Sequence, residues 1–149
     1  NKLGVIEMQA GDIVFVRGKT LMSRLIRFFD KGEFSHVAMA VSPNLIIEAQ
    51  YGTKVRIVPF RFNYEDCKIV DLSLTEDQRK QIQHTANKYV GKRYDYLQAI
   101  GLALKRGIDN QNAYICTEII HEMLKCVGYE CCPNDMKPNE LYRYLKGGD

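Results

Sequence analysis

The order of two hydrophobic patterns along the chain constrains its fold more than any other feature. Short apolar runs rich in Val, Ile and Phe occupy residues 12–72, whereas residues 74–146 carry apolar residues at helical spacing. Strands followed by helices are typical of an α+β domain. Tight connections between short strands further predict a curled antiparallel sheet of about five strands packed against helices. The predicted strands are Asp12–Val16, Ser35–Val41, Leu45–Ala49, Lys54–Pro59 and Cys67–Leu72.

The helical half of the chain has recognisable start and stop signals. Thr75 followed by Gln78 fits a capping box, and Gly91 fits a C-terminal cap. A helix that starts at about Cys116 and ends at Gly128 would turn a stripe of apolar residues inward. Further helices are predicted at Leu21–Phe29, between Asp95 and Gly107, and from Pro138 to Leu145.

Length, charge and cysteine usage bound the class of protein. The chain has 149 residues, of which 46% are hydrophobic, and this predicts a single domain over residues 1–149. The net charge is +3 with the basic residues scattered along the chain, which predicts no nucleic-acid partner. Five cysteines in an irregular set argue against a disulfide framework and favour a reducing compartment.

The sequence carries some signals on membrane contact and location. No apolar run approaches the roughly 18 residues of a membrane span. Asn1–Gly4 lacks the shape of a signal peptide, which predicts a cytoplasmic location, although the missing initiator Met leaves a removed leader open. Leu21–Phe29 mixes arginines with apolar residues and suits peripheral membrane contact, but a helix that packs on the core is the favoured interpretation. The sequence does not determine the oligomeric state.

Three histidines are candidates for the base of a thiol enzyme, which needs a thiolate, a nearby base and a group that orients the base. His84 is expected to face water on its helix. His121 follows Cys116 by five residues and would project about 140° away from it on the same helix. His36 opens a strand whose face continues with two small alanines, which leaves room for a substrate. A hydrogen-bonded strand histidine without catalytic function is the alternative interpretation of His36.

A hairpin supplies an orienting group for His36. The turn at Ser42–Asn44 pairs its two strands so that His36 lies opposite Gln50 and diagonal to Glu48, on one face. Glu48 sits in an apolar strand, where a carboxylate is costly unless it is paired. A hydrogen bond to the imidazole would pair it and fix the tautomer. Gln50 is the alternative orienting group.

Cys116 has the surroundings expected of a nucleophile. If it begins a helix, the positive end of the helix lowers the thiol pKa, and the first backbone amides can bind an oxyanion. Cys67 in a strand and Cys126 near a helix end fit inert cysteines instead. The spacing of Cys126, Cys131 and Cys132 does not match a zinc site, so neither a metal nor a cofactor is predicted.

Several segments in order resemble the YiiX-like branch of the circularly permuted papain-like enzymes, which are relatives of the NlpC-type cell-wall amidases. The resemblance covers residues 11–145. Each motif alone is weak, but together they are specific for the fold. The matching segments are Gly11–Phe15, Ser23–Arg27, Phe34–Met39, Ile47–Ala49, Gly91–Asp95 and Tyr114–Glu118.

The resemblance implies a function and roles for particular residues. Cys116 would be the nucleophile, His36 the base and Glu48 the orienting group, while Tyr114 would either donate to the substrate carbonyl or only pack. The implied activity is hydrolysis of an amide in a peptide or isopeptide, cell-wall-derived peptides included, through an acyl-enzyme. A lipid-directed acyltransferase or thioesterase, or a binding module without catalysis, are the alternatives.

Overall fold

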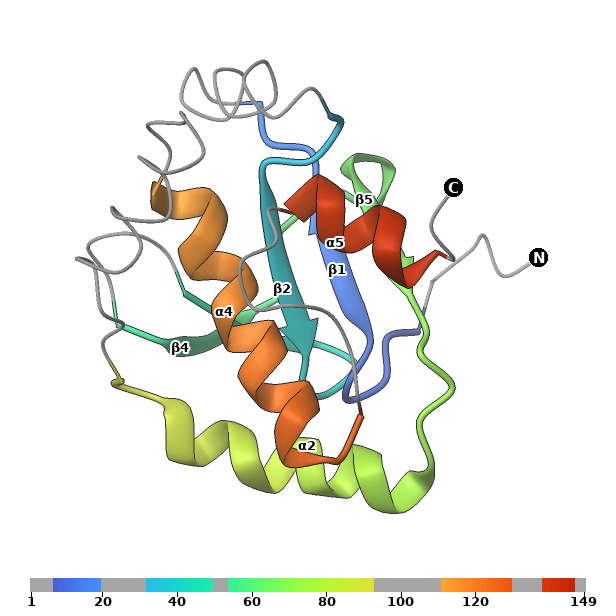
Figure 1. Cartoon of the computed structure of the whole chain (residues 1–149), viewed down its shortest axis with the longest axis vertical. Helices are drawn as coiled ribbons and strands as arrows, with labels where there is room; N and C mark the ends of the chain where they lie inside the picture. Colours follow the sequence, from blue (N-terminus) through green and yellow to red (C-terminus); the bar gives the residue numbers. More distant parts are fainter. Residues whose placement is uncertain (1–6, 20–31, 50–53, 93–110, 130–137, 147–149) are drawn as a thin grey trace.

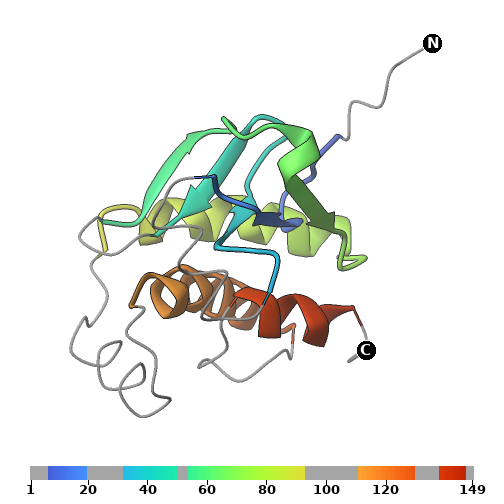
Figure 2. The same cartoon turned by 90° about the horizontal axis from the view of Figure 1, so that it is seen from above.

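The computed structural model describes residues 7–19, 32–49, 54–92, 111–129 and 138–146, with only the backbone described from residue 111 to 115. Five strands form one antiparallel sheet in the order β4-β3-β2-β1-β5. In the described residues, three α-helices accompany the sheet, and α4 and α5 lie together on one side of it (Figures 1 and 2). The elements are β1 (Ile13–Val16), β2 (His36–Ala40), β3 (Leu45–Glu48), β4 (Arg56–Pro59), the short 3₁₀ helix η1 (Tyr64–Asp66), β5 (Cys67–Val70), α2 (Glu76–Tyr89), α4 (Gln111–Cys126) and α5 (Pro138–Leu145).

The sheet confirms the predicted α+β class. All five predicted strands are present and are shorter than predicted by one or two residues. The β2–β3 hairpin has the predicted register, because Val41 N donates to Leu45 O at 2.9 Å and Met39 lies opposite Ile47. The sheet is open, since β4 and β5 are its two edges.

Strand alternation gives the sheet two different apolar faces. One face contributes alternate residues such as Val37 and Met39 to the main core, which also contains the buried stripe of α4. The other face carries Ala38 and Ala40 in a smaller cluster. Partly buried side chains pack against this smaller cluster, and they come from Val58, Phe60, Phe62, Cys67 and Ile69.

The predicted helix signals are confirmed for α2 and α5. The Thr75 side chain accepts from Gln78 N, and the Gln78 side chain accepts from Thr75 N, which completes the capping box. Gly91 follows the C-cap with a φ of +87°, a left-handed conformation that favours glycine. Pro138 opens α5 as predicted, because the first helical turn tolerates a missing N–H.

The predicted start of α4 is wrong. The helix is already formed at Gln111, so Cys116 lies five residues inside it. The inward stripe is nevertheless confirmed, since Ile119, Ile120, Met123 and Leu124 are buried. No helix in the described ranges is long and apolar enough to cross a membrane. The helices predicted at Leu21–Phe29 and between Asp95 and Gly107 lie outside the described residues.

Candidate active site

His36 and Glu48 meet across the β2–β3 hairpin. His36 Nε2 lies 3.1 Å from Glu48 Oε1, so the contact predicted from the hairpin register is present. The side chain of Glu48 is 0% exposed and that of His36 is 13% exposed. A buried carboxylate therefore holds one nitrogen of a nearly buried imidazole. Gln50, the alternative orienting group, lies outside the described residues.

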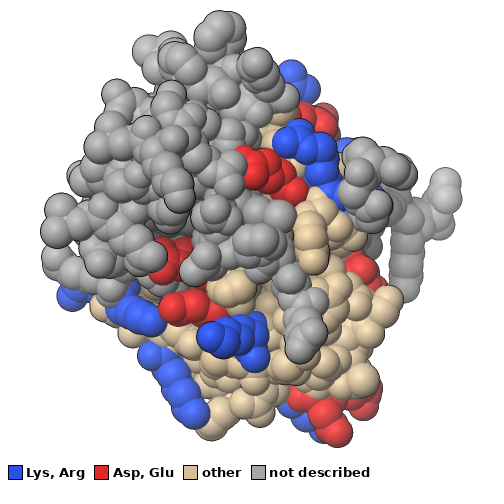
Figure 3. Space-filling view, in the orientation of Figure 1, with Lys and Arg blue, Asp and Glu red and all other residues tan. Residues whose placement is uncertain are grey.

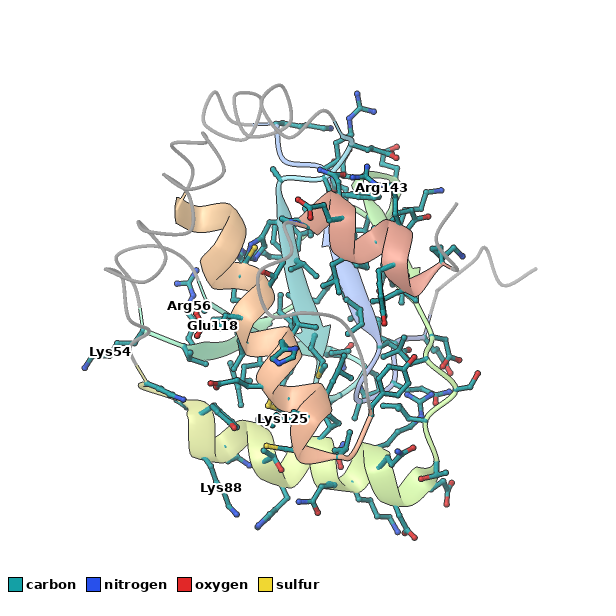
Figure 4. The ribbon with its side chains drawn as sticks, viewed as in Figure 1. Lys54, Arg56, Lys88, Glu118, Lys125 and Arg143 are labelled. Carbon is teal, nitrogen blue, oxygen red and sulfur yellow. The ribbon has the colours of Figure 1, made fainter. Side chains whose placement is uncertain are left out.

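Two arginines that the sequence interpretation missed complete the surroundings of Glu48. Arg56, labelled in Figure 4, lies opposite Glu48 on the edge strand β4. It donates to Glu48 Oε2 from Nε at 3.0 Å and from Nη2 at 2.8 Å. Arg61 Nη2 lies 3.1 Å from Oε1 and 3.0 Å from Oε2. The Arg61 guanidinium also stacks on the ring of Phe62, 4.5 Å from its centroid. The isolated glutamate in an apolar strand was the signal that such partners exist.

These contacts determine the charge of Glu48. Burial by itself would raise the pKa of this carboxyl, but the hydrogen bond and charge of His36, together with Arg56 and Arg61, lower it to about 2. Glu48 is therefore ionised at neutral pH and can only accept hydrogen bonds. Because Nε2 of His36 faces this acceptor, Nε2 must carry the ring proton. The lone pair of the neutral imidazole then resides on Nδ1, which is the atom able to take a proton.

Cys116 lies on the face of α4 that is turned to the sheet. It is 1% exposed and shares the buried stripe with Ile119 and Ile120. Helix α4 packs against β2, and its Gln111 end lies at the same end of the sheet as His36 (Figure 1). Cys116 belongs to the main core cluster together with Val37, whereas His36 alternates with Val37, shares the face of β2 that carries Ala38, and has its ring near that of Phe62. Strand alternation therefore puts the imidazole on the face of the sheet opposite to the main core, and the described contacts do not bring it together with the thiol.

The position of Cys116 within α4 changes what its backbone can do. In an α-helix each N–H donates to the carbonyl four residues earlier, so the amide of Cys116 is directed at Asn112 and not at a ligand. The favourable effect of a helix start on a thiolate also fades beyond the first turn. Both arguments made for Cys116 as the opening residue of the helix therefore fail. Tyr114 stands in the stretch of α4 where only the backbone is described.

The other described histidines and cysteines lie elsewhere, and Cys131 and Cys132 are outside the described residues. His84 is exposed on α2, as predicted, while His121 is half-buried on α4 and does not share the inward stripe. Burial and the neighbouring Asp66 raise the pKa of Cys67 to about 11, which fits an inert thiol. Within the described part of the chain, no group of three His, Cys, Asp or Glu side chains is arranged to hold a metal ion.

Acidic and basic side chains are interspersed on the described part of the face in Figure 3.

Comparison with known proteins relates this chain to a family. Residues 7–136 match the family described as permuted papain-like amidase enzyme, YaeF/YiiX, C92 family. A crystal structure described as metalloprotein yiiX from Escherichia coli O157:H7 is similar in fold, with a TM-score of 0.55 and 19% sequence identity. The match covers 80% of this chain and 66% of that one, so this chain spans just under two thirds of its length. A comparison with curated proteins found no match.

The family match and the fold agree with the resemblance noted in the sequence. The open antiparallel sheet packed against helices is consistent with a permuted papain-like fold, and the order His36, Glu48, Cys116 places the histidine before the cysteine. The family description supports amide hydrolysis at the level of the family. Because the match extends over residues 7–136, this chain belongs to the permuted papain-like amidases of the YaeF/YiiX, C92 family.

Proposed function

We propose that this protein hydrolyses an amide bond of a peptide or isopeptide with Cys116 as nucleophile, His36 as base and Glu48 as orienting group. The observation that carries the proposal is the fully buried, ionised Glu48 bonded to Nε2 of His36. A buried carboxylate lowers stability unless it is paired and hydrogen-bonded. One of the bonds that pair this carboxylate also fixes the tautomer of an imidazole. Helix α4, which carries Cys116, packs against β2, the strand that begins with His36, and the pairing of the thiol with the imidazole is part of the proposal.

The reaction then follows from the two ring nitrogens. Nδ1 of His36 takes the proton of the Cys116 thiol, and the thiolate sulfur bonds to the carbonyl carbon of the substrate. As the C–N bond breaks, the imidazolium gives its proton to the leaving amine, and a thioester remains on Cys116. A water molecule, deprotonated by Nδ1, attacks the thioester and releases the acid and the thiol. Glu48 stays ionised throughout and stabilises the imidazolium.

The oxyanion of the tetrahedral intermediate needs a donor other than the amide of Cys116. In this proposal the hydroxyl of Tyr114, two residues before the nucleophile, donates to that oxygen. Tyr114→Phe removes the hydroxyl and keeps the ring, so it is expected to lower the rate and leave the folded structure intact. An unchanged rate would leave Tyr114 with a packing role only.

An acyl-enzyme adduct gives the direct test of the proposed function. The protein is mixed with a library of peptides and isopeptides, quenched with acid and measured by intact-protein mass spectrometry. The expected result is a mass increase equal to an acyl group on Cys116, absent in Cys116→Ala and strongly reduced in His36→Ala. Amide cleavage that persists in Cys116→Ala would contradict the proposal, since no other described cysteine shares the stripe of α4 that faces the sheet.

A further inference from the structure

The side chain of Asn139, the second residue of α5, pairs with the backbone just before His36. Phe34 N donates to Asn139 Oδ1 at 2.8 Å, and Asn139 Nδ2 donates to Phe34 O at 2.8 Å. Asn139 is 4% exposed. The amide therefore satisfies the donor and the acceptor of one backbone residue, as a neighbouring strand would do.

Phe34 and Asn139 are closely packed by their neighbours. The ring of Phe34 contacts those of Phe15 and Tyr142, with centroids 5.5 and 4.9 Å apart, so β1 and α5 hold it from two sides. A Cβ atom at Gly32 would collide with the amide of Asn139. Glycine at this position is thus required for the close approach of α5 to the chain.

The residues between Phe34 and the imidazole are also fixed. Ser35 N donates to Val16 O at 3.0 Å, and Ser35 Oγ accepts from Gly18 N at 3.1 Å. His36 is next in the chain and is held through its side chain by Glu48. Three consecutive residues are therefore anchored, and α5 lies beside the end of β2 where this happens (Figure 1). An imidazole oriented only by its own side-chain bond could still shift with its backbone.

We propose that Asn139 is a positioning residue for His36: it fixes the backbone of Phe34 and so sets where Nδ1 lies relative to Cys116. The inference rests on the proposed function. It assigns a role to α5, which lies beyond the residues 7–136 that match the family. A displacement of about 1 Å between reacting groups is enough to slow an enzyme about a hundredfold, so a backbone anchor two residues from a base has a measurable effect.

The rate of alkylation of Cys116 by iodoacetamide, followed by peptide mass spectrometry across pH, tests this without knowledge of the substrate. Asn139→Ala is expected to lower the rate at neutral pH about tenfold or more. It should also weaken the Nε2–H signal of His36 in imidazole NMR spectra. Leu141→Ala is the matched control, because it removes a buried side chain of the same helix that has no bond to Phe34. It is expected to lower the melting temperature and to leave the alkylation rate of the folded protein unchanged.

Asn139→Asp supplies a rescue. Its carboxylate faces Phe34 O, which disfavours the charged form, and its protonated form regains both a donor and an acceptor. The alkylation rate of this variant relative to the wild type should therefore recover as the pH falls. A wild-type rate in folded Asn139→Ala, or an equal loss in Leu141→Ala, would overturn the positioning role. If His36→Ala itself leaves the alkylation rate of Cys116 unchanged, the proposed function fails instead.

Discussion

Two buried carboxylates of this protein, Glu48 and Asp12, are both neutralised by arginine, yet their surroundings differ. Asp12 accepts from Arg79 at 3.0 Å and from Gln9 N at 2.9 Å, and Arg79 also reaches Ala10 O. These bonds join α2 to the turn before β1. Glu48 accepts from two arginines, and its third partner is an imidazole. A buried acid paired with arginine therefore indicates a catalytic site only when it also bonds to a group that can transfer a proton, as Glu48 does with His36.

The largest effect is expected from Glu48→Gln. The amide keeps the size of the side chain but removes the charge that stabilises an imidazolium, and its NH₂ group can turn toward His36. The rate of amide cleavage, or of Cys116 alkylation, should fall about a hundredfold or more. A loss of less than about threefold would place Glu48 with Asp12 as a structural acid.

The double variant Arg56→Ala with Arg61→Ala should have a smaller effect that depends on pH. Without the arginines, burial is opposed only by His36, so the pKa of Glu48 rises from about 2. The acidic limb of the rate profile then moves to higher pH, and for each unit the rate at a fixed acidic pH falls about tenfold. Arg56→Lys is the matched control, since it keeps the charge and loses the two-pronged contact. If the acidic limb lies at the same pH in the double alanine variant and in Arg56→Lys, the two arginines do not determine the protonation of the site.

Asp12→Asn should affect stability and leave the chemistry unchanged. The amide oxygen still accepts from Gln9 N, but Arg79 loses the more buried of its two carboxylate partners, Asp12 and Asp71, which is expected to cost about 1–3 kcal/mol of unfolding free energy. Urea denaturation measures this loss, and the alkylation rate of Cys116 is measured on the same sample. A fall in that rate without unfolding would show that the two acids are not as different as their partners suggest.

The effect with the least bearing on the chemistry is the pH dependence of stability that Glu48 contributes. Its pKa is lowered on folding from 4.5 to about 2, so the stabilisation is fully present above pH 4.5 and is lost as the pH falls through about 2. Thermal unfolding between pH 5 and pH 2 should therefore show a steeper decline in the wild type than in Glu48→Gln. Equal slopes would mean that the folded protein does not hold Glu48 ionised.

The sequence predicted the half of the site that depends on local rules. A short turn and strict alternation determine the register of a hairpin, and that was enough to pair His36 with Glu48. Arg56 was missed because the reversal after β3 allowed several registers for β4. Arg61 was missed because it follows the end of β4 at Pro59, where strand pairing no longer predicts its neighbours. The start of α4 was placed too late because polar residues before Cys116 suggested irregular structure. Asn110, a favoured helix-capping residue type, was the available signal for an earlier start.

The β2–β3 hairpin has a consequence for when activity arises during synthesis. His36 and Glu48 are 12 residues apart, so base and orienting group meet through a contact that closes quickly and locally. The thiol of Cys116 reaches the sheet only when α4 docks, after β4, β5 and α2 have been made. A nascent chain therefore carries the imidazole–carboxylate pair before Cys116 has emerged. Under the proposed mechanism the nucleophile is then the last of the three groups to be made, and a chain that stops before α4 cannot form an acyl-enzyme.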